Sequence, residues 1–492
     1  VLHAAACRTH PCVDVRAEAG SNRLALLRAV PFPREERQAE MIRGGSASAA
    51  LTWRDGIAAL LLLVLSLSWT AIGISQAPEL SRYDEWTYID YSYKVTEGHI
   101  PVRGEALGGL TREAWSCRGM EGTIRKVSPP PCEEVASHPI SDWPYAGENY
   151  NGFHPPFYFV LAGFGGKGVA AVAGTDFVTG ARWISGLCVA CGIVALYFAI
   201  RRWRVGSIAS FGASVLTLAT PAVAASAVIV HNDAITPLAG AGAVWLLGRV
   251  FVDRKLGWAL PAALMLAVSL MRVMSTVALL TVTLMLVIAL AFPRAGGLQP
   301  RDRRPLAAII AGQLGALGAG YFAWTLWQNS RTADGYAPAI SGFSTDPYTG
   351  QPAGQILRTV LDPYGLTDPV TDWYLQPGLE SHWTSEWSQN LYWVYLFLPL
   401  VVLVLCARSG AGRMLSGSVA LGPAVAGAVV QARELVTSHA YFRVLSGRYA
   451  AALIPLYATS AAVICDRRIA RWVLVCFALL GYVAIVTGPF VS

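Results

Sequence analysis

Long apolar runs separated by short polar segments dominate the chain from residue 56 onward. A helix needs roughly 20 mostly apolar residues to cross a bilayer. The pattern therefore predicts an all-α, polytopic membrane helix bundle of eleven transmembrane helices rather than several soluble domains. The predicted spans are 56–76, 179–200, 206–229, 234–251, 257–271, 273–292, 305–327, 389–407, 414–432, 449–465 and 471–490.

The loops between these spans alternate in charge, which indicates their orientation. Segment 77–152 holds 7 Lys and Arg against 12 Asp and Glu, and segment 328–388 holds 2 against 7. Every loop on the opposite side is basic, as cytoplasmic loops are. We therefore expect a cytoplasmic N-terminus and two long extracytoplasmic loops, 77–178 and 328–388.

Both outer loops contain segments of ambiguous character. Residues 153–173 are moderately apolar, but a span there would invert every later loop, so we expect a helix at the membrane interface. The second loop and the span after it carry tryptophans that suit an interfacial belt or stacking on sugars, and we favour the belt. These tryptophans are Trp373, Trp383, Trp387 and Trp393.

Composition excludes some classes of function. The chain is 54% hydrophobic and 14% charged, and its net charge of +7 comes from the short inner loops. No polar segment carries a stripe of basic residues interleaved with aromatic ones, so the sequence does not suggest a nucleic-acid partner. Residues 1–54 resemble neither a signal peptide nor a periodic element. We expect a disordered or over-extended cytoplasmic segment there, with translation beginning at Met41, and a transmembrane domain over 55–492.

The 9 cysteines show no metal-ligand spacing. Most lie in or beside apolar runs, where they act as small hydrophobic residues. Cys117 and Cys132 differ because they share the first polar outer loop. An extracytoplasmic loop permits a disulfide between them, and free thiols are the alternative.

Adjacent carboxylates follow the first span, at Asp84 and Glu85. They suit a general base, ligands for a divalent cation such as Mg or Mn, or ordinary solvated acids. His154 precedes a Pro pair that suits the first turn of a helix. There it would bind a phosphate or serve as an interfacial cap.

A polar triplet, His231, Asn232 and Asp233, follows the third predicted span on the same side, and Asp233 also suits a helix cap. Arg272 lies between two apolar helices, where a charge needs a partner. Arg448 immediately precedes the tenth span. Its guanidinium would either donate two hydrogen bonds to a phosphate or extend to lipid headgroups. These groups fall on one side of the membrane, as the acidic pair does.

The order of these motifs resembles the GT-C superfamily, the polytopic glycosyltransferases that use lipid-phosphate-linked sugars, and within it an uncharacterised bacterial family. The resemblance covers about 80 to 465. It rests on YDEWTYIDYSYKVTEGHIP, NGFHPPFYFVLAG, ARWISGLCVACGIVALYFAIRRW, SAVIVHNDAITPLAG and SGRYAAALIPLYA.

The resemblance implies a bacterial plasma-membrane enzyme with an extracytoplasmic site. Asp84, with Glu85 beside it, would be catalytic, and His154, Arg272 and Arg448 would bind the lipid phosphate. The partners would be a polyprenyl-phosphate sugar, membrane lipid, and a glycan, lipid or protein acceptor. Further residues are candidates to contact donor or acceptor, namely Lys94, His231, Asn232, Asp233 and Tyr449.

Two other functions remain open. A non-enzymatic transporter or scaffold for envelope assembly would need a polar path across the membrane, and the predicted spans hold few charges at mid-depth. Another lipid-linked transferase, moving a phospho-group or an acyl chain, would share the phosphate-binding arginines.

Overall fold

The computed structural model describes residues 52–82, 84–120, 129–337, 345–347, 352–366, 381–442, 445 and 447–490. The expectations for residues 1–40, for translation from Met41 and for Trp373 lie outside these ranges. The α-helices are α2 Trp53–Gln76, α3 Glu85–Thr96, α4 Gly109–Arg118, α5 Phe157–Ala173, α6 Phe177–Arg202, α7 Ser207–Leu218, α8 Pro221–Ser226, α9 Thr236–Phe251, α10 Ala259–Met271, α11 Val277–Ala291, α12 Arg303–Asn329, α13 Ala353–Leu361, α14 His382–Cys406, α15 Gly410–Ser438, α16 Ile454–Cys465 and α17 Ala470–Thr487.

An all-α bundle of membrane type is confirmed. Within the described ranges, 9 helical segments are long and apolar enough to cross a bilayer. Short 3₁₀ turns at Asn232–Ile235, Val273–Thr276 and Gly447–Leu453 extend α9, α11 and α16 to that length. The predicted spans 206–229 and 257–271 correspond to shorter helices, α7 followed by α8, and α10. The count of eleven spans therefore remains a prediction.

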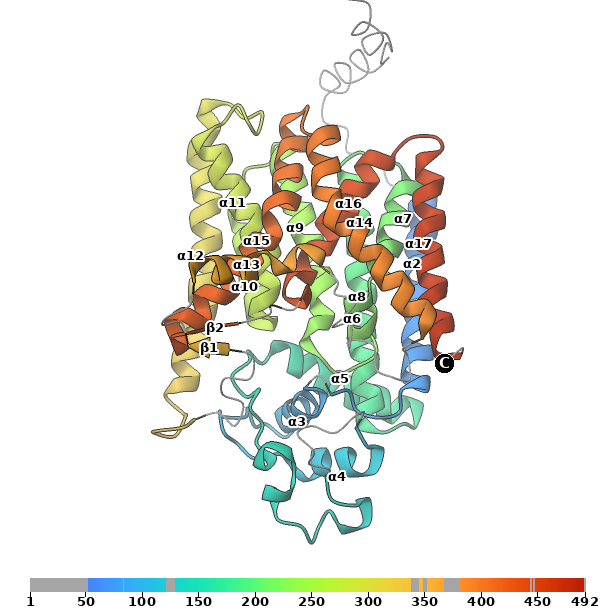
Figure 1. Cartoon of the computed structure of the whole chain (residues 1–492), viewed down its shortest axis with the longest axis vertical. Helices are drawn as coiled ribbons and strands as arrows, with labels where there is room; N and C mark the ends of the chain where they lie inside the picture. Colours follow the sequence, from blue (N-terminus) through green and yellow to red (C-terminus); the bar gives the residue numbers. More distant parts are fainter. Residues whose placement is uncertain are drawn as a thin grey trace, which may run out of the picture. The chain divides into compact units, whose positions relative to one another are not determined.

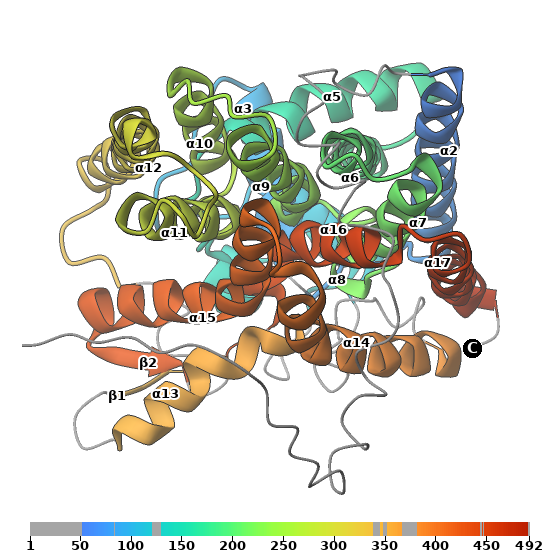
Figure 2. The same cartoon turned by 90° about the horizontal axis from the view of Figure 1, so that it is seen from above.

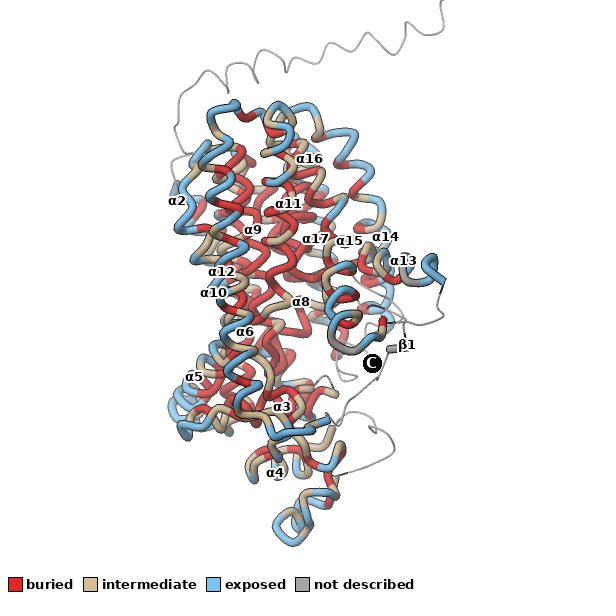
Figure 3. The backbone as a smooth tube through the Cα atoms, turned by 90° about the vertical axis from the view of Figure 1, so that its left-hand side faces the viewer, coloured by how far each residue is buried: buried red, intermediate tan, exposed pale blue. Residues whose placement is uncertain are grey.

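Buried residues run along the length of the bundle, and exposed residues lie on its outer helices (Figure 3). α9 is the most enclosed of the long helices, and α12 is the least. Outer helices expose large apolar side chains, such as Leu326 (68%) on α12 and Val404 (73%) on α14. An apolar exterior around an apolar core suits lipid as the surrounding solvent.

The third predicted span is interrupted, because Pro221 begins α8 after α7 ends at Leu218. Such a break frees backbone carbonyl groups that water cannot reach at this depth. At the break, the Trp387 indole N–H donates to Ala219 O at 2.7 Å, and within α8 the Trp69 indole N–H donates to Ala224 O at 2.8 Å. Irregular backbone is thus tolerated because protein encloses it.

The segment between α2 and α6 forms a cap at one end of the bundle, with α3, α4 and α5 at the bottom of Figure 1. Seen from above in Figure 2, α5 lies lengthwise while α6 is viewed end-on. A helix over most of 153–173 is therefore present, and its placement at the membrane interface remains a prediction. β1 (Thr345–Pro347), which follows α12, pairs antiparallel with β2 (Ala440–Phe442), which follows α15, and Thr345 lies opposite Phe442.

Candidate functional site

Asp84 stands immediately before α3 in the left-handed backbone region, with φ of 60°. Aspartate tolerates this region better than most residues, yet such strain persists mainly where surrounding contacts impose it. The Asp84 carbonyl accepts the N–H of Thr87 at 2.9 Å, and its carboxylate Oδ1 accepts the Tyr150 hydroxyl at 2.6 Å. Asp84 is half-buried, so part of this residue is open to solvent.

Glu85 lies in an entirely different environment from its neighbour. Glu85 and Arg182 are both 0% exposed, and Arg182 donates from Nε and Nη2 to the two carboxylate oxygens at 2.8 Å each. The carboxylate also accepts the N–H of Ser81 at 2.7 Å and that of Val230 at 2.8 Å. Arg182 donates further to two backbone carbonyls, those of Ala77 and Glu79. Glu85 therefore joins the start of α3 to α6 and to the residue before His231, and both its oxygens are occupied.

Tyr88, one turn into α3, is the point around which the predicted site residues gather. Its ring lies 4.5 Å from that of His231 and 5.7 Å from that of His154, and its hydroxyl is 3.4 Å from His154 Nε2. Burial raises the pKa of Tyr88. Nearby charges also act on that pKa, namely those of Asp84, Arg272 and Arg448. Residues from four distant segments thus share one neighbourhood.

The two histidines of this neighbourhood are neutral at pH 7. Burial, with the charges of Arg272, Arg433 and Arg448, lowers the pKa of His154 to about 3. Burial also holds the pKa of His231 well below its usual range. His231 Nδ1 accepts the backbone N–H of Asp233 at 3.0 Å, so the proton of the neutral ring is on Nε2. The 3.3 Å approach of Nδ1 to the Asp233 carboxylate is therefore not an ion pair.

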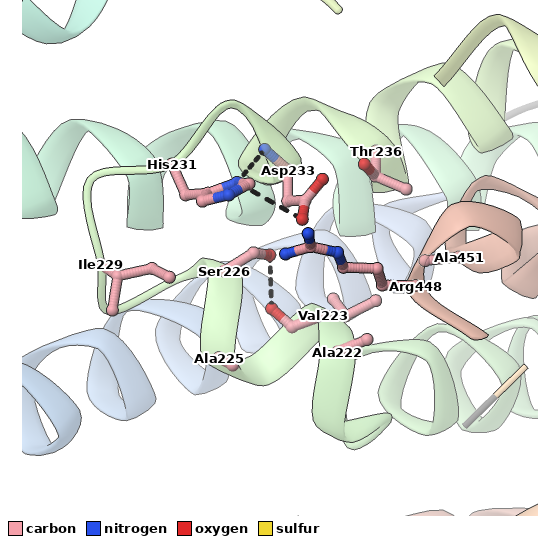
Figure 4. A pocket seen from close by; sticks show the side chains of 10 residues that line it. All are labelled: Ala222, Val223, Ala225, Ser226, Ile229, His231, Asp233, Thr236, Arg448 and Ala451. Atoms are coloured by element: carbon pink, nitrogen blue, oxygen red, sulfur yellow. Dashed lines mark hydrogen bonds and ion pairs between the residues drawn. The ribbon is translucent and has the colours of Figure 1, made fainter. Parts of the chain in front are cut away.

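Arg272 follows α10 directly and is only 7% exposed. It forms an ion pair with Asp233, which explains how a charge is accommodated between two apolar helices. Asp233 also lines a pocket with His231, Ser226, Thr236 and Arg448. Figure 4 shows the Arg448 guanidinium beside the Asp233 carboxylate. The pocket measures about 20 Å³, the size of roughly one water, so a larger ligand must displace side chains.

Lys94 has a different setting from the other predicted contact residues. It pairs with Asp90 at 2.9 Å and with Glu105 at 2.7 Å, and it donates to Ala106 O at 2.6 Å. These contacts fasten α3 to the loop that follows it. Lys94 thus has an anchoring position outside the Tyr88 neighbourhood.

Asn232 and Tyr449 are also predicted contact residues. Asn232 is 1% exposed, and within the described part of the chain neither atom of its amide has a hydrogen-bond partner. Tyr449 is half-buried, with the Arg448 guanidinium 5.4 Å from its ring centroid. Tyr449 therefore lies beside the pocket.

Cys117 and Cys132 form a disulfide, which ties the end of α4 to a segment 15 residues further on. No three His, Cys, Asp or Glu side chains gather as a metal site in the described ranges. Since Arg182 and two backbone N–H groups occupy Glu85, a cation shared by Asp84 and Glu85 does not fit this arrangement.

Comparison with known proteins adds no family to this picture. No protein-family model matches the chain, and no curated protein matches it.

Sequence reasoning missed Arg182, Tyr88 and Tyr150. Arg182 had a usable signal, because it is a charge inside the predicted span 179–200, and such residues need a partner. Tyr88 and Tyr150 carry no such signal, since aromatic residues are frequent throughout both outer loops.

Proposed function

We propose that the protein is a membrane glycosyltransferase of GT-C type, which moves a sugar from a polyprenyl-phosphate donor to an extracytoplasmic acceptor. One observation carries the proposal: a half-buried carboxylate, two neutral histidines and two arginines, distant in sequence, surround Tyr88 at one end of an apolar bundle. A lipid donor would reach such a position from the bilayer.

Arg448 and Arg272 are the groups suited to the donor phosphate. A guanidinium presents several N–H groups in a planar fork that matches phosphate oxygens. Arg272 is already paired with Asp233, so a donor phosphate would share it with that carboxylate or displace the carboxylate. Neutral His154 and His231 add polar contacts without adding charge.

Asp84 is the group suited to activate the acceptor. The acceptor oxygen attacks the anomeric carbon and forms the new glycosidic bond, while the bond from that carbon to the phosphate oxygen breaks. The acceptor proton passes to the Asp84 carboxylate, and polyprenyl phosphate leaves with the bonding electrons. The arginines stabilise the charge that develops on the phosphate. A single displacement inverts the anomeric configuration.

The disulfide supports placing this chemistry outside the cytoplasm. Disulfides persist in oxidising compartments and are rare in the cytosol. The Cys117–Cys132 bond lies in the acidic loop that the charge pattern assigns to the outside. We therefore propose a plasma-membrane location with the N-terminus in the cytoplasm.

The test is transfer from radiolabelled polyprenyl-phosphate sugars by membranes that carry the protein. Asp84→Asn keeps the shape of the side chain and removes the base, so transfer should fall at least about 100-fold. Glu133→Gln is the matched control, because Glu133 is an exposed acid of the same loop. Equal transfer by Asp84→Asn and Glu133→Gln would show that Asp84 is not the base.

The same assay separates the other two functions. A transporter would move the labelled lipid across sealed vesicles without forming a glycoside. A transferase of another group would leave the labelled sugar on its carrier. Arg448→Lys should raise the KM for the donor more than it lowers kcat, because it retains the charge but loses the fork.

A further inference from the structure

A cluster of aromatic residues fills the outer cap beside Asp84. We call Trp86, Trp115, Trp143, Tyr145 and Tyr150 the outer aromatic cluster. The three tryptophans are 1%, 0% and 1% exposed. The rings of Trp86 and Trp115 stack at 4.7 Å, and Trp86 lies 6.4 Å from Tyr145 and 6.1 Å from Tyr150. The Tyr150 hydroxyl donates to Asp84, so the cluster adjoins the proposed base.

The indole N–H groups of all three tryptophans are buried, and none has an acceptor among the residues described. A buried indole N–H normally finds a partner. The bundle of this same chain follows that rule. Trp69, Trp324 and Trp387 each donate to a backbone carbonyl, at 2.8, 2.7 and 2.7 Å. The missing acceptors are therefore a property of the outer cap.

Two neighbouring groups share this feature. Arg112 Nε and Ser116 Oγ, both on α4, are buried without a hydrogen-bond partner in the described ranges. The Arg112 guanidinium lies 5.1 Å from the Trp143 ring. All five groups can donate a hydrogen bond, and only the serine hydroxyl can also accept one. The cap therefore offers donors that the described part of the chain does not use.

The segment after Trp143 is held in an unusual backbone conformation. Tyr145, Ala146 and Gly147 have φ of 59°, 52° and 67°, so two of three consecutive positive-φ residues carry side chains. Strain of this kind persists at ligand clamps and switch segments. The Tyr145 ring lies 6.4 Å from that of Trp86 and 5.3 Å from that of Tyr150, so movement of this segment would change the packing on both rings.

We propose that the outer aromatic cluster is a carbohydrate-binding subsite. A sugar presents hydroxyl oxygens to accept from the indole N–H groups and an apolar ring face to pack on the aromatic rings. The subsite takes its ligand when residues 145–147 move aside. Its identification as the acceptor site rests on the proposed glycosyl transfer, and the Tyr150–Asp84 hydrogen bond would then connect acceptor binding to the base.

The test measures sugar binding by the full-length protein in lipid nanodiscs, without any donor. Saturation-transfer NMR would use the methyl pyranosides of glucose, galactose, mannose and N-acetylglucosamine as probes. The variants are Trp115→Phe and Trp143→Phe, which retain an aromatic ring but remove an N–H. Trp69→Phe is the matched control, since it makes the same change at a buried tryptophan whose N–H is paired.

We expect at least one pyranoside to bind the parent, and each cluster variant to bind it about tenfold more weakly. Trp69→Phe should bind like the parent. Thermal unfolding should show the reverse order, because only Trp69→Phe loses a hydrogen bond made within the protein. Trp143→Phe provides a second variant in case Trp115→Phe does not fold. A Trp143→Phe protein that unfolds like the parent but binds the sugar more weakly would support the subsite.

Either of two results would overturn the subsite: no pyranoside binds the parent, or both cluster variants bind as tightly as Trp69→Phe. Sugar binding that depends on the cluster, in a protein without transfer activity, would refute the glycosyltransferase and leave the subsite standing. Transfer without such binding would refute only the subsite.

Discussion

The buried Glu85–Arg182 pair gives the most quantitative prediction. Arg182→Met leaves the Glu85 carboxylate buried without its counter-charge, and Glu85→Gln leaves the Arg182 guanidinium in the same position. Breaking one side of a buried pair costs about 3–5 kcal/mol. Both residues are 0% exposed and water cannot compensate for either loss. Each single variant should therefore lose about this much free energy of unfolding.

The double variant Glu85→Gln/Arg182→Met should be more stable than either single variant. It buries no charge, and the side-chain oxygen of the introduced glutamine would still accept from Ser81 or Val230. Three backbone groups lose a partner at about 1 kcal/mol each: the carbonyls of Ala77 and Glu79, and whichever of the Ser81 and Val230 N–H groups the glutamine oxygen does not reach. The expected loss is thus about 3 kcal/mol, against the roughly 8 kcal/mol that two independent single losses would sum to.

Reversible unfolding in mixed micelles, followed by tryptophan fluorescence, would measure all four proteins of this cycle. The matched control is the pair of Arg118 with Asp176, which joins α4 to the start of α6 at 2.5 Å. Their side chains are 22% and 52% exposed, so solvent should reduce their coupling to about 1 kcal/mol or less. The reasoning fails if the double Glu85/Arg182 variant is less stable than both singles.

The outer cap and its neighbourhood give three further predictions. His154 has a pKa of about 3 in the folded protein against 6.5 when unfolded, so the unfolded chain binds its proton more readily. The free energy of unfolding should therefore fall as the pH falls from about 6.5 towards 3. His154→Gln should flatten this part of the pH–stability curve, and an unchanged curve would contradict the buried neutral ring. Cys117→Ser/Cys132→Ser should lower the stability of the cap by about 3 kcal/mol, as expected for a closed loop of this length and as thermal unfolding with and without reductant would measure. In a cysteine-free background, Glu133→Cys should react with an impermeant maleimide added to intact cells and Arg303→Cys should not; the opposite result would reverse the proposed orientation.

The membrane bundle was predictable because its cause is local. Apolar runs of sufficient length must be helical in lipid, whatever their neighbours, and this identified nine segments that the structure describes as long apolar helices. The predicted span 206–229 shows the limit of that reasoning. Its hydropathy is continuous, but Pro221 interrupts the helix, and the Ala219 carbonyl at the break accepts the Trp387 indole N–H from another helix. Hydropathy does not report such long-range partners.

The candidate site was predictable as a set of residues but not as a geometry. Asp84, His154, His231, Asp233, Arg272 and Arg448 could each be chosen because a polar group next to an apolar run is unusual. That Arg272 would pair with Asp233, and that Lys94 would instead fasten a loop, depends on how distant segments pack. The same holds for Glu85, whose partner is 97 residues away.

The adjacent acids Asp84 and Glu85 have different environments that depend on each other. Because Glu85 accepts from Ser81, Arg182 and Val230 at once, it joins the backbone before α3 to the segment that carries His231 and Asp233. Asp84, whose backbone is left-handed, instead accepts the Tyr150 hydroxyl with its carboxylate. Two carboxylates one residue apart thus receive opposite environments. In the proposed mechanism, the rigid buried Glu85 would fix the position of the half-buried Asp84, the proposed base, relative to the segment that carries His231 and Asp233.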